Sequence, residues 1–289
     1  MTQFKFDSPN HSADSHWASE YQDTKLNYEL GNSPRLVGGT TFCSKAAIDQ
    51  TQVRLLTHAA VHSIEETRKI LMKWRRQGQC LRDIYLHGIA ESARLIGELW
   101  SSDEIDFVNV TIALSRLHQI MEELSPEFLS EGNAAHRDLS LLLMSEPDSQ
   151  HGLGGFMLSE FFRQAGWRVT LAAPQDIEEF KRLFLSDWFD AVALSISTDR
   201  QIDAVSEAVS ELRKEALNPQ LKIYVGGPMA SLCADELNWT GTSLLQTDAA
   251  QTVQLVTQEI TNFKTSLAET SHATGCHVHL EKLGKVNKM

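Results

Sequence analysis

His151 and Gly154 stand in a segment whose residue types can bind a metal and admit a bulky ligand. They belong to the run DSQHGLG, which follows an apolar stretch and precedes a helical apolar pattern that begins at Phe156. A histidine nitrogen is a common metal ligand, and a glycine lets a ligand approach the backbone closely. A loop between a strand and a helix lies at the carboxyl edge of a parallel sheet, where open α/β sheets receive cofactors. The segment therefore predicts a cofactor-binding loop, although a lone histidine at this spacing is more often simply solvated.

Two further segments end neighbouring strands of the predicted sheet. Ser195 and Ser197 close the third apolar run, and Gly226 with Gly227 closes the fourth. Taken singly, such a serine is typical of a helix cap and such a glycine pair of a turn. Because the carboxyl ends of parallel strands meet at one edge, we expect these residues to face the same crevice as the histidine loop.

The elements that would position these residues alternate regularly over residues 137–266. Strands separated by helices of about 10 to 15 residues are typical of a parallel sheet with right-handed crossovers. Five such units predict a flavodoxin-like α/β domain. The expected strands are 139–145, 167–172, 190–196, 221–226 and 243–246, and the expected helices are 153–165, 176–185, 201–217, 229–237 and 249–266.

An all-α cap is predicted before this domain, over residues 49–132. Apolar residues recur at helical spacing over 53–74, 84–99 and 107–124. The segment 125–127, which contains a proline, is expected to end the third helix and to open a short one. Helices joined by short turns indicate a small antiparallel bundle.

The remaining segments and the overall charge exclude several classes of protein. Residues 1–48 and 267–289 are polar, and we expect a flexible extension and a tail there. The net charge of −12 argues against direct nucleic-acid binding, which needs a basic face. The four cysteines are far apart in the sequence, which indicates a reducing cytoplasm rather than a disulfide framework. No apolar run is long enough to span a membrane.

Taken together, the three strand-end segments resemble the cobalamin-binding domain family over about residues 137–265. In that family they surround the nucleotide tail of a corrinoid, and the histidine binds cobalt from below. The resemblance implies that His151 is the lower ligand of cobalt. The other residues that it places around the cofactor in this domain are Ser149, Gly154, Ser195, Ser197, Gly226 and Gly227.

One departure from the family concerns the partner of the histidine. Cobalamin enzymes place an aspartate two residues before it, where this chain has Ser149, with Asp148 one residue further back. A metal-bound imidazole needs a hydrogen-bond partner on its other nitrogen to fix its tautomer. Ser149, Asp148 or Ser195 could supply that partner.

The bundle resembles the helical cap of light-sensing cobalamin regulators around the run LIGELW, which ends at Trp100. There a tryptophan covers the upper face of the corrin, so Trp100 is a candidate cofactor-binding residue. Core packing is the alternative interpretation. Light sensors of the CarH type carry a histidine directly after this tryptophan and a Glu-His pair about ten residues on, where this chain has Ser101 and then Val110 and Thr111. The histidines that could approach the corrin instead are His62, His87 and His118.

Over the whole chain, the sequence is most similar to the AerR/PpaA family, which joins a helical bundle to a cobalamin domain and lacks a DNA-binding or catalytic domain. The resemblance implies a cytoplasmic antirepressor, not an enzyme, that carries adenosyl- or hydroxocobalamin. It would respond to light or redox state by binding a CrtJ/PpsR-type repressor of photosynthesis genes, with at most indirect contact to DNA. The oligomeric state stays open.

Two other functions remain possible. A corrinoid protein of a methyltransferase system also pairs a bundle with this domain, but such proteins generally keep the aspartate that Ser149 replaces. A haem-binding redox sensor is the other alternative, because Cys276, His277 and His279 could bind a metal or haem. His58 and His62, one helical turn apart, could chelate a metal.

Overall fold

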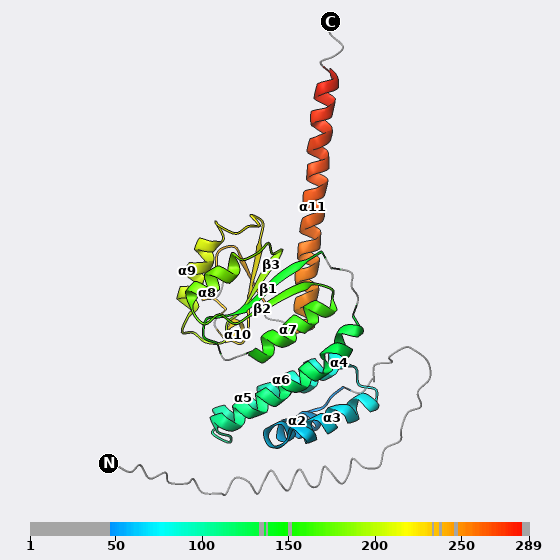
Figure 1. Ribbon diagram of the computed structural model, residues 1–289, viewed down its shortest axis with the longest axis vertical. Coiled ribbons are helices and arrows are strands. Elements are labelled where there is room, and N and C mark those ends of the chain that lie inside the picture. The colour runs from blue at the N-terminus through cyan, green and yellow to red at the C-terminus, as the bar shows by residue number, and fades with distance from the viewer. Residues whose placement is uncertain are drawn as a thin grey trace, which may run out of the picture. The chain divides into compact units, whose positions relative to one another are not determined.

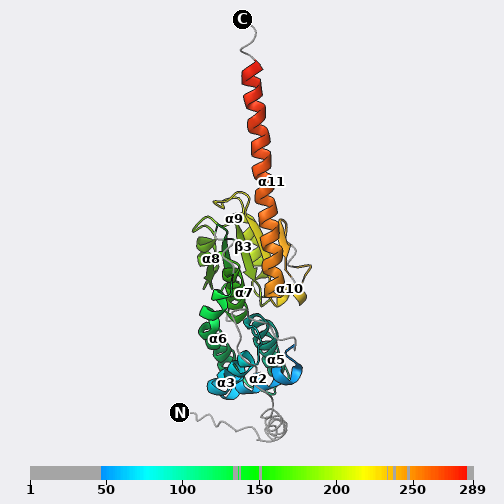
Figure 2. The same ribbon diagram turned by 90° about the vertical axis from the view of Figure 1, so that its right-hand side faces the viewer.

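The computed structural model describes residues 47–132, 136, 138–149, 152–232, 234–236, 239–245 and 248–284, with side chains as far as residue 266. The predicted extension lies almost wholly outside these residues, and so does His151. The chain divides into two compact units, Met1–Leu124 and Ser125–Met289 (Figures 1 and 2).

The first unit is helical, as the sequence predicts. Tyr85 lies fully buried at its centre, and its hydroxyl donates to the carbonyl oxygen of Met121 at 3.1 Å. Burial of a large aromatic side chain of this kind is the main source of stability in a small bundle. The helices are α2 (Gln50–His62), α3 (Ile64–Arg76), α4 (Leu81–Asp83), the π-helix η1 (Ile84–Ile89), α5 (Ala90–Ser101) and the start of α6 (Phe107–Ser130).

A one-residue break at Ser63 divides what the apolar pattern presents as one continuous helix. Ser63 has extended backbone angles and ends α2, while its Oγ accepts a hydrogen bond from Glu66 N at 3.3 Å and so begins α3. A serine followed three residues later by glutamate is a sequence signature of a helix start. The signal was therefore present in the sequence, but the apolar spacing concealed it.

The second unit contains a five-stranded parallel sheet in the order β2-β1-β3-β4-β5. This is the flavodoxin-like order, so the predicted fold class is confirmed. The central strands are continuous apolar runs because both faces of a parallel sheet are covered. The strands are β1 (Ser140–Ser145), β2 (Arg168–Ala172), β3 (Ala191–Ser195), β4 (Lys222–Gly226) and β5 (Thr242–Leu244).

Helices cover both faces of this sheet (Figure 1). On one face, α8 and α9 pack against each other and enclose a core that includes Phe180, Val192 and Val205. On the other, α7 packs against β1, β2 and α11. The helices are α7 (Gly152–Gln164), α8 (Ile177–Phe184), α9 (Ile202–Leu212), α10 (Met229–Leu232) and α11 (Ala249–Gly284). None of the described helices is both long and apolar enough to cross a membrane.

Two helices run further than the sequence predicts. Helix α6 continues through Pro126 to Ser130 instead of ending at 125–127. Phe128 in its last turn is buried against Phe161 with ring centroids 5.0 Å apart, and its carbonyl oxygen accepts from Gln164 Nε2 at 2.8 Å. Tertiary packing thus holds a turn that the proline disfavours locally.

Helix α11 is the second, because it runs to Gly284 where the prediction ends it at about 266 and places a tail beyond. Two of the predicted helices are shorter than expected, since α9 ends at Leu212 and α10 at Leu232. These differences concern element ends, which depend on caps and neighbours more than on apolar spacing.

Asp190 links the start of β1 to α11 through a hydrogen bond and an ion pair. Its carboxylate is 7% exposed, accepts from Ser140 N at 2.8 Å, and forms an ion pair with Lys264 Nζ at 2.8 Å.

We expect Asp190→Ala to lower the free energy of unfolding by about 2 kcal/mol, because a buried backbone donor loses its acceptor. Denaturant unfolding measures this. Asp138→Ala is the matched control, since Asp138 lies 4.0 Å from the same ammonium but is 75% exposed; an equal loss in both variants would contradict the assignment.

Candidate cofactor site

The carboxyl ends of β1, β3 and β4 lie side by side. The strand register pairs Ser145 with Ser195, and Ser195 with Gly226. The segments that the sequence singled out after β3 and β4 therefore meet next to the end of β1. This is also where the strand order changes direction, because the chain places β2 on one side of β1 and then crosses over to place β3 on the other. Ligands of doubly wound sheets bind at such a point.

Glu146, the first residue after β1, joins the β1 and β3 loops. Its carboxylate is almost wholly buried, and each of its oxygens lies 3.1 Å from the donating Ser197 N. Its own amide donates to Ser195 O at 3.2 Å. A buried carboxylate is stable only when its oxygens are hydrogen-bonded, so this contact fixes both loops. Glu146 is not among the residues predicted from the sequence, although an acidic residue directly after an apolar strand was a visible signal.

Two serine hydroxyls at this edge lack partners. Ser145 Oγ and Ser197 Oγ are buried and make no hydrogen bond within the described part of the chain. An unsatisfied buried polar atom costs about 1 to 3 kcal/mol, so such atoms in folded proteins call for an explanation. A polar ligand at the edge between β1 and β3 would provide one. Ser197 was a predicted site residue, and Ser145 was not.

The loop after β1 is held from several sides before it reaches the histidine. Asp148 adopts a left-handed backbone with φ of 59°, and its amide donates to Pro174 O at 2.9 Å. Gln201 Nε2 donates to Pro147 O at 3.1 Å, and Ser149 N donates to Glu146 O at 3.3 Å. The loop therefore has a defined course up to Ser149. His151, the predicted cobalt ligand, lies outside the described residues.

The glycines at the site differ in what they contact. A methyl group at Gly154 would meet nothing within 4 Å, so no described neighbour demands glycine at this position and the space beside it is open. Gly227 has φ of +97°, and a methyl group there would lie 2.6 Å from Ile196 O. Gly227 is thus glycine because the β4 loop packs directly on the β3 loop. Gly226 has looser surroundings, with Leu245 O 3.4 Å from the corresponding position.

Trp100 belongs to the first unit and lies in the last turn of α5. Its side chain is 47% exposed, and its ring centroid lies 6.3 Å from that of Phe107, which is 66% exposed. Val108 and Ile112 are also exposed at the start of α6. We call Trp100, Phe107, Val108 and Ile112 the Trp100 patch. Its exposure contradicts the alternative interpretation that Trp100 is a core residue.

The other candidate histidines belong to ordinary helical surroundings. His58 and His62 stack with ring centroids 4.2 Å apart, and burial together with the neighbouring His62 lowers the pKa of His58. His118 lies 3.7 Å from Glu122. No group of three or more metal-binding side chains occurs among the described residues. Cys276, His277 and His279 lie in α11 beyond the described side chains.

Comparison with known proteins agrees with this geometry. Residues 142–253 match the family model of the B12 binding domain. The chain is also 27% identical over 168 residues to a Rhodobacter capsulatus protein described as an uncharacterized 20.5 kDa protein in the bchF-crtJ intergenic region. That alignment covers 58% of this chain and 87% of the relative.

A solved structure shows the same fold. The monomethylamine corrinoid protein of Methanosarcina barkeri superposes with a TM-score of 0.58 at 15% identity, over 70% of this chain and 94% of the other. At this identity the likeness concerns the fold alone. The family match and the relative together support the predicted resemblance to AerR-like proteins, and residues 142–253 are similar to the B12 binding domain.

Proposed function

We propose that this protein is a cobalamin-binding regulator that responds to light or redox state and acts by binding a CrtJ/PpsR-type repressor. The observation that carries the cofactor assignment is the pair of unpartnered hydroxyls of Ser145 and Ser197 at the β1–β3 edge. The regulatory assignment is supported by the relative, which is encoded in the bchF-crtJ intergenic region of Rhodobacter capsulatus.

The residues at this edge fit cobalamin in type. In the proposal His151 would hold cobalt, and Ser149 or Asp148 would accept a hydrogen bond from the N–H of its second ring nitrogen. The hydroxyls of Ser145 and Ser197 bond polar atoms of the nucleotide tail. When bound, cobalamin supplies a visible chromophore and a cobalt–carbon bond that light can cleave.

The regulatory readout is assigned to the first unit. Large apolar side chains that are exposed side by side mark a place where a ligand or partner binds, which a single exposed residue does not. We assign Trp100 to the upper face of the corrin because it adjoins the exposed ring of Phe107. A change of upper ligand would then alter the packing of the Trp100 patch, and with it the surface offered to the repressor.

A methyl-carrying corrinoid protein is the second candidate function. The fold likeness to the monomethylamine corrinoid protein favours it, but Ser149 stands where such proteins generally have an aspartate. A serine hydroxyl does not ionise near neutral pH, so it cannot take up and release the proton that an aspartate would during turnover. The proposal of a regulator therefore takes precedence.

The cobalt ligand is tested by His151→Ala. With hydroxocobalamin or adenosylcobalamin, the wild-type protein is expected to keep a corrinoid spectrum that changes on illumination. The variant is expected to lose the signature of a histidine ligand and to bind at least about tenfold more weakly, because one metal–ligand bond is gone. His136→Ala is the histidine control. An unchanged spectrum in His151→Ala would remove the lower-ligand assignment, and a haem Soret band in the purified protein would point to the redox sensor.

Ser145→Ala and Ser197→Ala separate binding from folding. Each substitution removes an unsatisfied buried hydroxyl, so the cofactor-free protein is expected to be equally stable or up to about 1 kcal/mol more stable. Cobalamin affinity is expected to fall about tenfold in the double variant, because two hydrogen bonds to the tail are lost. Thermal unfolding and spectral titration measure the two effects. Loss of stability without loss of affinity would show that the hydroxyls serve the fold alone.

The proposed binding to a repressor is tested with a purified CrtJ/PpsR-type repressor on a biosensor surface. Cobalamin-loaded protein is expected to bind with an affinity that differs between dark and light, and Trp100→Ala should abolish that difference. Trp188→Ala is the matched control, because Trp188 is 51% exposed but belongs to the second unit. Methyl transfer to a partner enzyme in the dark, with no repressor binding, would favour the second candidate function.

A further inference from the structure

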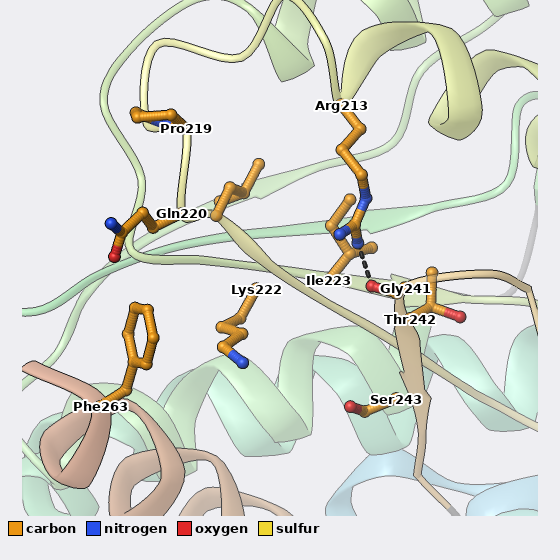
Figure 3. A pocket seen from close by; sticks show the side chains of 10 residues that line it. Arg213, Pro219, Gln220, Lys222, Ile223, Gly241, Thr242, Ser243 and Phe263 are labelled. Atoms are coloured by element: carbon orange, nitrogen blue, oxygen red, sulfur yellow. Dashed lines mark hydrogen bonds between the residues drawn. The ribbon is translucent and has the colours of Figure 1, made fainter. Parts of the chain in front are cut away.

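A cavity lies at the opposite edge of the same sheet from the proposed cofactor site. It has a volume of about 400 Å³ and is bounded by Lys222, the first residue of β4, and by Thr242, the first residue of β5. In a parallel sheet the amino ends share one edge, so this cavity is distant from the carboxyl ends that hold the cofactor loops. The side chains that matter here are Arg213, Gln220, Lys222, Thr242, Ser243 and Phe263 (Figure 3).

The lining of this cavity is cationic in an acidic protein. Two cations, Arg213 and Lys222, line it, and no carboxylate does. The whole chain carries 38 acidic residues and a net charge of −12. A cleft that concentrates positive charge attracts anions, and it does so against the field of the rest of the molecule. This local reversal of charge indicates an anionic ligand.

Arg213 is the more informative of the two cations. Its Nη2 donates to Gly241 O, which Figure 3 shows as a dashed line, while its Nε is buried and has no hydrogen-bond partner within the described part of the chain. Arg68 and Arg163 each form an ion pair with a glutamate, whereas no carboxylate of the described residues forms an ion pair with Arg213. Gly241 has φ of +77°, and a methyl group there would lie 2.7 Å from Nη1, so the turn is shaped around the guanidinium. The guanidinium of Arg213 is therefore held in place, but not all of its N–H groups have an acceptor.

The positive charge of Lys222 is only partly balanced by a carboxylate. Its Nζ lies 3.4 Å from Glu259 Oε1 and 4.9 Å from the centre of the Phe263 ring. The carboxylate of Glu259 is shared between Lys222 and Tyr224, because its other oxygen accepts a hydrogen bond from Tyr224 OH at 3.0 Å. Burial, together with that carboxylate, raises the pKa of Tyr224, which therefore stays a donor. The Lys222 side chain is 36% exposed, so its ammonium can turn towards a ligand in the cavity.

We propose that this cavity binds a small phosphorylated molecule. The phosphoryl group would take the hydrogen bonds that Arg213 leaves unused and pair with Lys222, and Thr242 and Ser243 of β5 also line the cavity. Arginine forks and lysine ammonium groups are the usual partners of phosphate, and a dianion suits two cations better than a carboxylate does. Phe263 offers an apolar surface for the rest of the molecule, and the volume is that of a small-ligand site.

Binding at this place would act on α11. Phe263 and Glu259 belong to α11, whereas Arg213 follows α9 and Lys222 begins β4. A ligand held by all of them would tie the helix to the amino edge of the sheet. The same ligand is expected to protect the domain against thermal unfolding, because it binds the folded chain and not the unfolded one.

Phenyl phosphate, inorganic phosphate and benzoate are the probes, titrated by calorimetry into the full-length protein. Phenyl phosphate is expected to bind most tightly, and Arg213→Gln and Lys222→Gln are each expected to weaken it about tenfold or more. Lys214→Gln is the matched control, because it removes the same charge from the neighbouring exposed position and should leave binding unchanged. Circular dichroism checks that each variant is folded, and Lys222→Gln decides the outcome if Arg213→Gln fails to fold.

Three results would overturn the proposal. These are no binding of phenyl phosphate to the wild-type protein, equal binding by all variants, or an equal loss in Lys214→Gln, which would indicate a general charge effect. Benzoate binding as tightly as phenyl phosphate would overturn the assignment to phosphate. Since none of these measurements involves cobalamin, their failure leaves the proposed regulator function untouched.

Discussion

The contact between Glu146 and the amide of Ser197 is the constraint on which the cofactor edge depends. It joins two loops that follow different strands and that are 51 residues apart in the chain. A buried carboxylate would be very costly without this donor, so neither loop can move away alone. The loop that leads to His151 therefore starts from a fixed point, and the unpartnered hydroxyls of Ser145 and Ser197 are held beside it.

The second unit carries polar chemistry at both edges of one sheet, and the two edges differ in character. At the carboxyl edge the acidic residue Glu146 is buried close to serine hydroxyls and glycines. The amino edge presents Arg213 and Lys222 around an open cavity. Because parallel strands direct all their carboxyl ends one way, a doubly wound domain can hold two unlike sites without one interfering with the other.

Much of the fold followed from the sequence. Each of the five strands lies within about two residues of its predicted range, because apolar runs of this length between helices have few other arrangements. Helix ends were less predictable. Ser63 breaks a continuous apolar pattern through a single cap, and Pro126 stays inside a helix because Phe128 is buried against Phe161. Both helix ends depend on side-chain contacts that the spacing of apolar residues along the chain does not reveal.

The sequence by itself determined the fold class and placed the serines that end β3 and the glycines that end β4 at one edge of the sheet. Residue types and spacing suffice for this, since parallel strands must end together. Only the tertiary structure decided that Glu146 is the link between the loops, that Trp100 is exposed, and that Arg213 and Lys222 line one cavity. Those facts concern which side chains are buried and which lack partners, and burial is a property of the packed chain rather than of any segment in it.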